Sequence, residues 1–269
     1  MNLDKLPPVG LGTWENDDPV MCKRTVAMAL KLGYRHIDTA RFYGNEEAVG
    51  AGIEESAVPR SELFIGTKVH PFAEGLSYDA VMNGFETSLK LLGTSYIDIL
   101  YVHWPVGDYQ PTETLGAFND LIQDGKLRHV GVSNFNIELI EEAQDILRVP
   151  LFAHQVERHP LLPQNKLVTH AQNNDYLLVG YSPLARGAVM NIDVIQQVAN
   201  QHDVSAACVA LAWGLAPGGV VTIPKATSVD HLSDNFKASE LQLRHDELEL
   251  IDALEKRERF IEREGAPWL

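Results

Sequence analysis

The sequence has few cysteines and no long apolar segment. Only two of its 269 residues are cysteine, Cys22 and Cys208, and neither lies in a CxxC or other metal-ligand spacing. This scarcity excludes a disulfide-stapled scaffold and a cysteine-based metal site, so we expect a reduced, cytoplasmic protein without a metal. No run of about 18 uncharged apolar residues occurs, and we therefore expect no membrane-spanning helix.

Basic residues are also scarce. The chain carries 22 Lys and Arg against 37 Asp and Glu, which gives a net charge of −15. This balance argues against nucleic acid as a partner, because nucleic-acid binding requires a basic face. The N-terminal segment MNLDKLPPVGLGTW lacks a basic region followed by an apolar core, so we expect no signal peptide. An anionic ligand would have to be held by local basic groups.

The remaining pattern is an alternation of short strand-like and longer helix-like segments. Eight Val- and Ile-rich runs read as strands: VGLGT, RHIDT, LFIGTK, IDILYVH, RHVGVS, FAHQVE, LLVGYS and VVTIP. Periodic segments predict helices at about 18–32, 46–56, 77–92, 112–125, 136–147, 163–174, 191–215 (as two helices), 228–239 and 245–257. Ser77 and Ser205 are suited to cap helix starts, and Gly33, Gly93 and Gly125 to end helices.

This alternation predicts parallel βαβ units. Strands that are apolar almost throughout fit a sheet buried on both faces. Eight repeats in about 240 residues fit a closed (β/α)8 TIM barrel. A doubly wound open sheet is the alternative, but Gly10 and Gly12 are followed by Thr13-Trp14 and the GxGxxG signature is lacking. We expect residues 1–269 to form one such domain.

Four polar residues stand at or just beyond the ends of three consecutive predicted strands. Asp38, Lys68 and His103 close strands two, three and four, and Tyr43 follows strand two. In barrels of this kind the active site lies at the carboxyl ends of the strands. Together the four supply a carboxylate, an ammonium, an imidazole and a phenol, which suffice to protonate a carbonyl oxygen. We expect Lys68 to lower the pKa of Tyr43, Asp38 to hold Lys68, and His103 to orient the carbonyl.

Each of the four also has an ordinary structural explanation. Asp38 could cap a turn, Tyr43 could pack in a core, Lys68 could be a solvated strand end, and His103 could be a satisfied core histidine. Their joint occurrence at three consecutive strand ends favours the catalytic interpretation.

Seven motifs in order carry a family resemblance: HIDTARFYGNEEAVG, FIGTK, YVHWP, GVSNF, QVERHP, YSPLARG and TIPKA. Over about residues 7–240 the chain resembles the aldo-keto reductases, and in length it is most similar to short bacterial members such as 2,5-diketo-D-gluconate reductases. The resemblance implies a (β/α)8 barrel, NADPH bound across the mouth, and reversible carbonyl reduction. It also implies that Asp38, Tyr43, Lys68 and His103 form the catalytic tetrad, with Tyr43 as proton donor.

The resemblance assigns cofactor contacts along most of the chain. Ser133, Asn134 and Gln155 would bind the nicotinamide amide, and Tyr181 would stack on its ring. Ser182, Pro183 and Leu184 would run beside the pyrophosphate. The full implied set is Thr13, Trp14, Asp38, Ser133, Asn134, Gln155, Tyr181, Ser182, Pro183, Leu184, Lys225, Thr227, His231 and Asn235.

The segment TIPKATSVDHLSDNF departs from the family pattern. Lys225 and Asn235 are kept, but Ala226 replaces the usual serine, with Thr227 as a substitute hydroxyl. His231 stands where arginine is usual and Asp234 where glutamate is usual. Arginine is a permanent bidentate phosphate ligand, whereas histidine is mostly neutral at pH 7. We therefore expect a preference for NADPH with unusual tolerance of NADH.

The substrate wall is expected to include Trp14, Tyr43, His70, His103 and Trp104. His70 stands two residues beyond Lys68, where the family often has tryptophan. The tail RFIEREGAPWL is short, whereas longer family members close the pocket with an extended loop. We therefore expect an open site with broad specificity for small, polar carbonyl compounds such as methylglyoxal, keto-sugars or keto-acids.

Two other functions remain open at this point. The barrel could be a non-catalytic NADP-binding subunit, because a fold does not fix a function. Alternatively, Lys68 could act as a Schiff-base nucleophile, as in barrel aldolases. We expect the protein to be a monomer whose partner is its small-molecule substrate.

Overall fold

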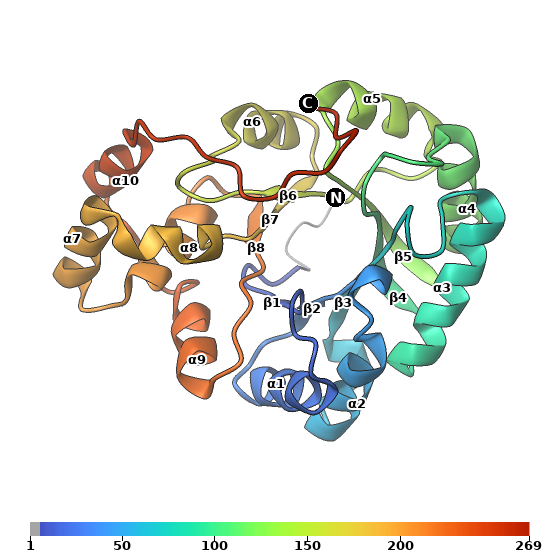
Figure 1. Ribbon diagram of the computed structural model, residues 1–269, viewed down its shortest axis with the longest axis horizontal. Helices are drawn as coiled ribbons and strands as arrows, with labels where there is room; N and C mark the ends of the chain where they lie inside the picture. The colour runs from blue at the N-terminus through green and yellow to red at the C-terminus, as the bar shows by residue number, and fades with distance from the viewer. Residues whose placement is uncertain (1–5, 269) are drawn as a thin grey trace.

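The computed structural model describes residues 6–268. They form a (β/α)8 barrel in which eight parallel strands lie at the centre and helices surround them (Figure 1). The strands are β1 (Leu11–Gly12), β2 (His36–Asp38), β3 (Phe64–Val69), β4 (Ile97–Val102), β5 (Leu127–Ser133), β6 (Ala153–Glu157), β7 (Leu177–Tyr181) and β8 (Val220–Thr222). They pair in sequence order from β1 to β8.

The barrel closes between its first and last strands. Val9 forms a parallel bridge with Thr222, and the Gly10 amide donates to the Thr222 carbonyl at 2.8 Å. The Thr222 amide in turn donates to the Pro8 carbonyl at 2.9 Å. Closure removes the sheet edges and rules out the doubly wound open sheet. The predicted TIM barrel is confirmed.

The outer ring follows the predicted helices. It comprises α1 (Pro19–Lys31), α2 (Glu46–Ser56), α3 (Tyr78–Leu92), α4 (Pro111–Gln123), α5 (Ile137–Ile146), α6 (Asn165–Asn173), α7 (Asp193–His202), α8 (Ala206–Leu215), α9 (Val229–Lys237) and α10 (His245–Asp252). Short 3-10 turns add η2 (Arg41–Tyr43), η3 (Arg60–Glu62) and η4 (Ala185–Asn191). None of the helices within residues 6–268 combines the length and apolarity needed to cross a membrane.

Helix ends are set by the residues that the sequence suggested. The Ser77 and Ser205 hydroxyls accept the Ala80 and Cys208 amides at 3.4 and 3.0 Å, which caps α3 and α8. Gly93 takes φ of +63° at the end of α3, a conformation that glycine adopts without strain. The prediction for the last helix is wrong at its end, because α10 stops at Asp252 rather than near residue 257.

Strand side chains alternate between two apolar layers. In β4, Leu100 and Val102 pack outward against the helices, whereas Ile99 and Tyr101 fill the barrel interior. Gly131 of the neighbouring strand makes room for Tyr101, since a Cβ there would lie 2.4 Å from the tyrosine ring. Both cysteines are buried and unpaired. The filled interior leaves the carboxyl ends of the strands as the place for chemistry.

Candidate functional site

Three strand ends and one turn bring the predicted tetrad together. Asp38 is the last residue of β2, Lys68 lies near the end of β3, and His103 directly follows β4. Tyr43 ends the η2 turn, so its phenol reaches the same mouth. The Tyr43 hydroxyl lies 3.5 Å from Lys68 Nζ, and the Tyr43 and His103 rings meet edge to face at 5.7 Å.

Lys68 is completely buried and its ammonium is fully engaged. Nζ donates to Asp38 Oδ1 in a very close contact and to the Thr39 carbonyl at 2.8 Å. The second oxygen of Asp38 accepts from Gln155 Nε2 at 2.8 Å. Burial lowers the pKa of Lys68 and raises the pKa of Asp38, while their mutual attraction opposes both shifts.

A second buried carboxylate fixes the turn that carries Tyr43. Glu46, at the start of α2, accepts from Thr67 Oγ1 at 2.6 Å and from Arg41 Nη1 at 2.9 Å. Arg41 is the first residue of η2, so this pair ties the turn to β3. The GNEE segment that follows Tyr43 thus holds the phenol in place.

Burial keeps the phenol and the imidazole neutral. Desolvation, Asp38 and Tyr181 raise the pKa of Tyr43 well above its ordinary value of 10.0. Our expectation that Lys68 lowers this pKa is therefore wrong for the protein alone. Desolvation, Lys68, His70 and Arg263 hold the pKa of His103 well below 6.5. At neutral pH Tyr43 retains its proton, and His103 can offer a single N–H donor.

A cavity of about 510 Å³ opens over the tetrad. Its lining includes Asp38, Tyr43 and His103, and this volume lies in the range of small-molecule sites. The expected residues that line it are Thr13, Trp14, Asp38, Tyr43, His103, Trp104, Asn134, Gln155, Tyr181, Ser182, Pro183, Leu184 and Lys225. They come from seven of the eight strand ends and the loops that follow them.

Several expected residues lie outside this lining. His70 is buried behind Phe42, with the two rings stacked at 4.0 Å, so Phe42 takes the wall position predicted for His70. Ser133 is buried and accepts from Asn134 Nδ2 at 3.1 Å. Thr227, His231 and Asn235 lie near or on α9, beyond Lys225. Asp234 accepts a hydrogen bond from Ser205 and therefore faces the start of α8.

The donors and acceptors of the cavity fit a nicotinamide. Asn134 takes a positive φ of +63°, and its Nδ2 donates to the His103 carbonyl at 3.0 Å. Its Oδ1 accepts from the Tyr181 hydroxyl at 2.8 Å and keeps a second lone pair free. This tether holds the Tyr181 ring along the cavity wall, where a flat ring could stack. Lys225, an exposed cation, lies at the β8 end of the cavity and suits a phosphate.

Sequence reasoning missed the contribution of the C-terminal tail. Ile261, Glu262 and Arg263 line the cavity, so the prediction of an open site is wrong on this side. No periodic pattern marks these residues, and only the three-dimensional path of the tail reveals them. Phe42 was also missed, although it directly precedes Tyr43.

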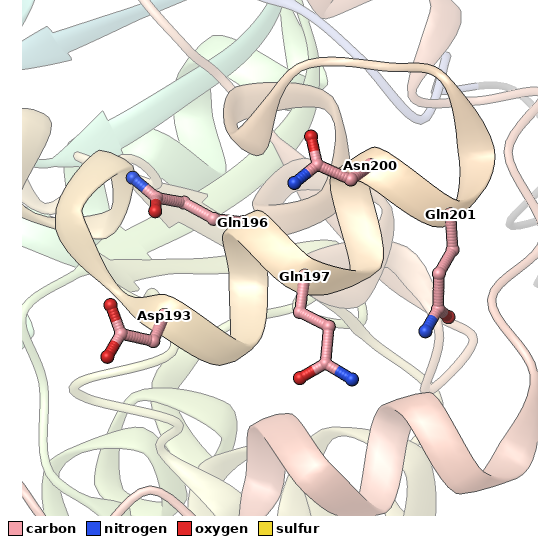
Figure 2. Close-up of a pocket in the computed structure, with 5 residues that line it drawn as sticks. All are labelled: Asp193, Gln196, Gln197, Asn200 and Gln201. Carbon is pink, nitrogen blue, oxygen red and sulfur yellow. The ribbon is translucent and has the colours of Figure 1, made fainter.

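A second hollow lies on the outer surface of α7. Figure 2 shows its lining of five polar side chains from that one helix, Asp193, Gln196, Gln197, Asn200 and Gln201. None of the tetrad residues lies there, and its side chains offer only one charged group. We assign the chemistry to the barrel mouth.

Comparison with known proteins agrees with this geometry. Residues 8–256 match the model of the aldo/keto reductase family. The chain is 38% identical to glyoxal reductase of Bacillus subtilis, over 95% of this chain and 91% of the relative. It is also 38% identical to methylglyoxal reductase DkgB of Escherichia coli O157:H7, over 97% of each chain.

Solved structures agree as well. A structure provisionally named 2,5-diketo-D-gluconic acid reductase B superposes with a TM-score of 0.92 at 34% identity, covering 97% of this chain and 92% of the other. An aldo-keto reductase of Bombyx mori in complex with NADP gives a TM-score of 0.87 at 31% identity, covering 96% and 92%. The protein described here is thus an oxidoreductase that uses a nicotinamide cofactor, and it belongs to the aldo/keto reductase family.

Proposed function

We propose that the protein uses NADPH to reduce small aldehydes and ketones to alcohols. The methylglyoxal-like, keto-sugar and keto-acid classes are the proposed substrates. The observation that carries the proposal is that Tyr43, Asp38 and His103 line one cavity, with the buried Lys68 ammonium 3.5 Å from the Tyr43 hydroxyl. The relatives named glyoxal reductase and methylglyoxal reductase support this substrate class.

The residues divide the chemistry among themselves. NADPH, when bound in this cavity, would supply the hydride for the carbonyl carbon. Tyr43 and His103 hold the carbonyl oxygen, because both line the cavity and both carry a hydrogen at neutral pH. Tyr43 passes its proton to that oxygen, and the resulting phenolate is stabilised by the nearby Lys68 ammonium. Asp38 holds Lys68 in position through their ion pair.

The proposed cofactor contacts extend from the tetrad to α9. Asn134 and Gln155 would bind the carboxamide, Tyr181 would stack on the ring, and Ser182 to Leu184 would follow the pyrophosphate. Lys225, Thr227 and His231 would surround the 2′-phosphate. His231 lies exposed in the first turn of α9, and its backbone amide donates to Ser228. An imidazole offers phosphate one donor at a time where arginine offers a bidentate fork, so we propose NADPH preference with tolerance of NADH.

The burial of Lys68 argues against a Schiff-base aldolase. A nucleophilic lysine must reach the substrate carbonyl with a free amine. Lys68 is 0% exposed, does not line the cavity, and gives its hydrogens to Asp38 and Thr39. Nothing in the site favours this reaction over reduction.

Replacement of Tyr43 by phenylalanine tests the proposal. We expect kcat for NADPH-dependent reduction of methylglyoxal to fall about 10²- to 10⁴-fold, the usual contribution of a positioned general acid. The dissociation constant for NADPH should stay within about twofold. Tyr78→Phe is the matched control, because its hydroxyl binds Asp120 on the exposed surface. Turnover by Tyr43→Phe at the wild-type rate, with NADPH still bound, would refute the proton-donor assignment.

A further inference from the structure

The C-terminal segment crosses the mouth of the barrel. In Figure 1 the chain after α10 (red) passes in front of the β6 region and ends near α5. Its last described part packs on the loop after β4: Ala266 and Trp268 cluster with Trp104 and Val106. The Trp104 and Trp268 rings lie 5.6 Å apart. The segment is thus attached at its far end beside His103.

A buried carboxylate attaches the middle of the same segment. Glu157, the last residue of β6, is completely buried. Its Oε1 accepts the Phe260 amide at 2.7 Å and its Oε2 accepts the Ile261 amide at 3.0 Å. His159 Nε2 lies 3.0 Å from the same carboxylate. Backbone amides bound to a buried carboxylate fix the local path of a chain, because neither partner has access to water.

This attachment carries Arg263 to the cavity. The Arg263 guanidinium lies over the rings of Trp104, Phe72 and Phe42, at 5.3, 5.4 and 5.6 Å from their centroids. These aromatic faces orient the cation without neutralising it. Arg263 lines the same cavity as Tyr43 and His103, and its charge contributes to the low pKa of His103.

Most other charges at the cavity are paired or distant from the tetrad, but the Glu262 carboxylate also lines it and forms no ion pair within residues 6–268. Arg186 binds Glu15 at 2.6 Å, and Asp38 is paired with Lys68. Lys225 lies at the β8 end proposed for the phosphate. Arg263 forms no ion pair with any residue in the described range 6–268. A protein with a net charge of −15 therefore places a guanidinium without an ion pair in the cavity that its candidate proton donor also lines.

We propose that Arg263 is a specificity-determining residue that binds an anionic group of the substrate, and that Glu157 is the positioning residue that holds Arg263 there. The preferred substrates are then carbonyl compounds that also carry a carboxylate. A guanidinium pairs with a carboxylate through two parallel hydrogen bonds, which adds geometric selectivity to charge. This inference rests on the reductase function proposed above.

Two aldehydes of nearly equal shape test the Arg263 assignment. 4-Carboxybenzaldehyde is anionic at pH 7, and 4-formylbenzamide is its neutral counterpart. With NADPH and the wild type, we expect kcat/KM for the acid to exceed that for the amide about tenfold or more. Arg263→Gln should lower kcat/KM for the acid about tenfold, mainly through KM, and change that for the amide less than threefold. Arg263→Lys should restore part of the preference.

Replacement of Glu157 tests the positioning role. Glu157→Gln should reduce the preference for the acid several-fold and leave the dissociation constant for NADPH unchanged. Because Glu157 acts through Arg263, the double variant Glu157→Gln/Arg263→Gln should be no worse on the acid than Arg263→Gln alone. Phe260→Pro removes one of the two amide donors while Glu157 stays in place, although it also removes the ring contact with His159. It should reproduce the effect if Glu157→Gln folds poorly.

Glu247→Gln is the matched control. Glu247 is also a buried carboxylate that binds a backbone amide and a histidine, but it belongs to α10 at the periphery of the barrel (Figure 1). We expect this variant to lose stability and to retain the preference for the acid. The preference is a ratio on one enzyme, so partial unfolding does not change it.

The possible outcomes separate the two proposals. Absence of NADPH-dependent reduction of either aldehyde by the wild type would overturn the proposed function. If the wild type reduces both aldehydes with equal kcat/KM, or if Arg263→Gln lowers kcat/KM equally for both, only the role of Arg263 would be overturned. Additive losses in the double variant would overturn the positioning role of Glu157.

Discussion

The ion pair of Asp38 and Lys68 allows a prediction with a defined magnitude. Both side chains are at most 2% exposed, and within residues 6–268 the hydrogen-bond partners of Lys68 Nζ are Asp38, the Thr39 carbonyl and the Tyr43 hydroxyl. Asp38→Asn leaves the ammonium buried without a counter-charge. Breaking a buried pair in this way costs about 3–5 kcal/mol. We expect the free energy of unfolding at pH 7 to fall by about that amount.

Removal of the second charge should recover part of the loss. In Asp38→Asn/Lys68→Met no charge remains buried at this position, and such a replacement can be close to neutral. The double variant should therefore be more stable than Asp38→Asn, although we expect both to lack reductase activity. Urea unfolding followed by circular dichroism measures the three stabilities, with equal m-values as the check for a common two-state transition.

The pH dependence of the single variant follows from the same burial. Desolvation lowers the pKa of Lys68 below its ordinary 10.5, and loss of Asp38 removes the main influence that raises it. At pH values between the lowered pKa of Lys68 in the folded protein and its pKa of about 10.5 in the unfolded chain, the unfolded chain binds more protons than the folded one. The stability of the variant therefore rises with pH in this range. The loss in free energy of unfolding of Asp38→Asn relative to the wild type should therefore become smaller from pH 7 toward pH 10.5. A loss in free energy of unfolding below about 1 kcal/mol at pH 7, or a loss that grows as the pH rises, would refute this reasoning.

Three further predictions concern other parts of the molecule. His231→Arg should lower the dissociation constant for NADPH about tenfold and leave the dissociation constant for NADH unchanged, as measured by fluorescence titration. If the wild type binds NADPH more than about a thousandfold more tightly than NADH, the proposed tolerance of NADH is wrong. Because the pKa of Tyr43 is held well above 10.0, kcat for carbonyl reduction should not fall between pH 7 and 9. A steady-state profile in which kcat falls with an apparent pKa of about 7–8 would contradict a neutral Tyr43 phenol. Gly131→Ala should lower the free energy of unfolding by about 1–3 kcal/mol, because its Cβ would lie 2.4 Å from the Tyr101 ring. Gly116→Ala in α4 should raise it by about 0.5–1 kcal/mol, since no atom of another element lies within 4 Å of the added Cβ. A lower melting temperature for Gly116→Ala than for Gly131→Ala would contradict the packing account.

The barrel and the tetrad could be predicted because their signals are local. Each strand is a short apolar run with turn residues behind it, and Asp38, Lys68 and His103 stand at fixed places on these runs. Parallel pairing in sequence order then brings strand ends together without further information. The family resemblance pointed to Asn134, Gln155 and Tyr181, and the structure places all three at the mouth.

The tail could not be predicted because its signals are non-local. Arg263 reaches the cavity through contacts between residues more than 100 positions apart, such as Glu157 with Ile261. No periodicity marks RFIEREGAPWL, and its length alone suggested an open site. The raised pKa of Tyr43 was missed for a similar reason, since burial depends on packing that a sequence does not display. The monomeric state and the cytoplasmic location stay predictions.

The most direct test of the account follows the hydride itself. The protein is incubated with methylglyoxal and NADPH that carries deuterium at the transferred position, and the products are examined by mass spectrometry. We predict an alcohol that carries one deuterium on the former carbonyl carbon, formed in step with the oxidation of NADPH. A product without deuterium, or no alcohol at all from cofactor-loaded protein, would contradict the assignment of this barrel mouth as a carbonyl-reducing site.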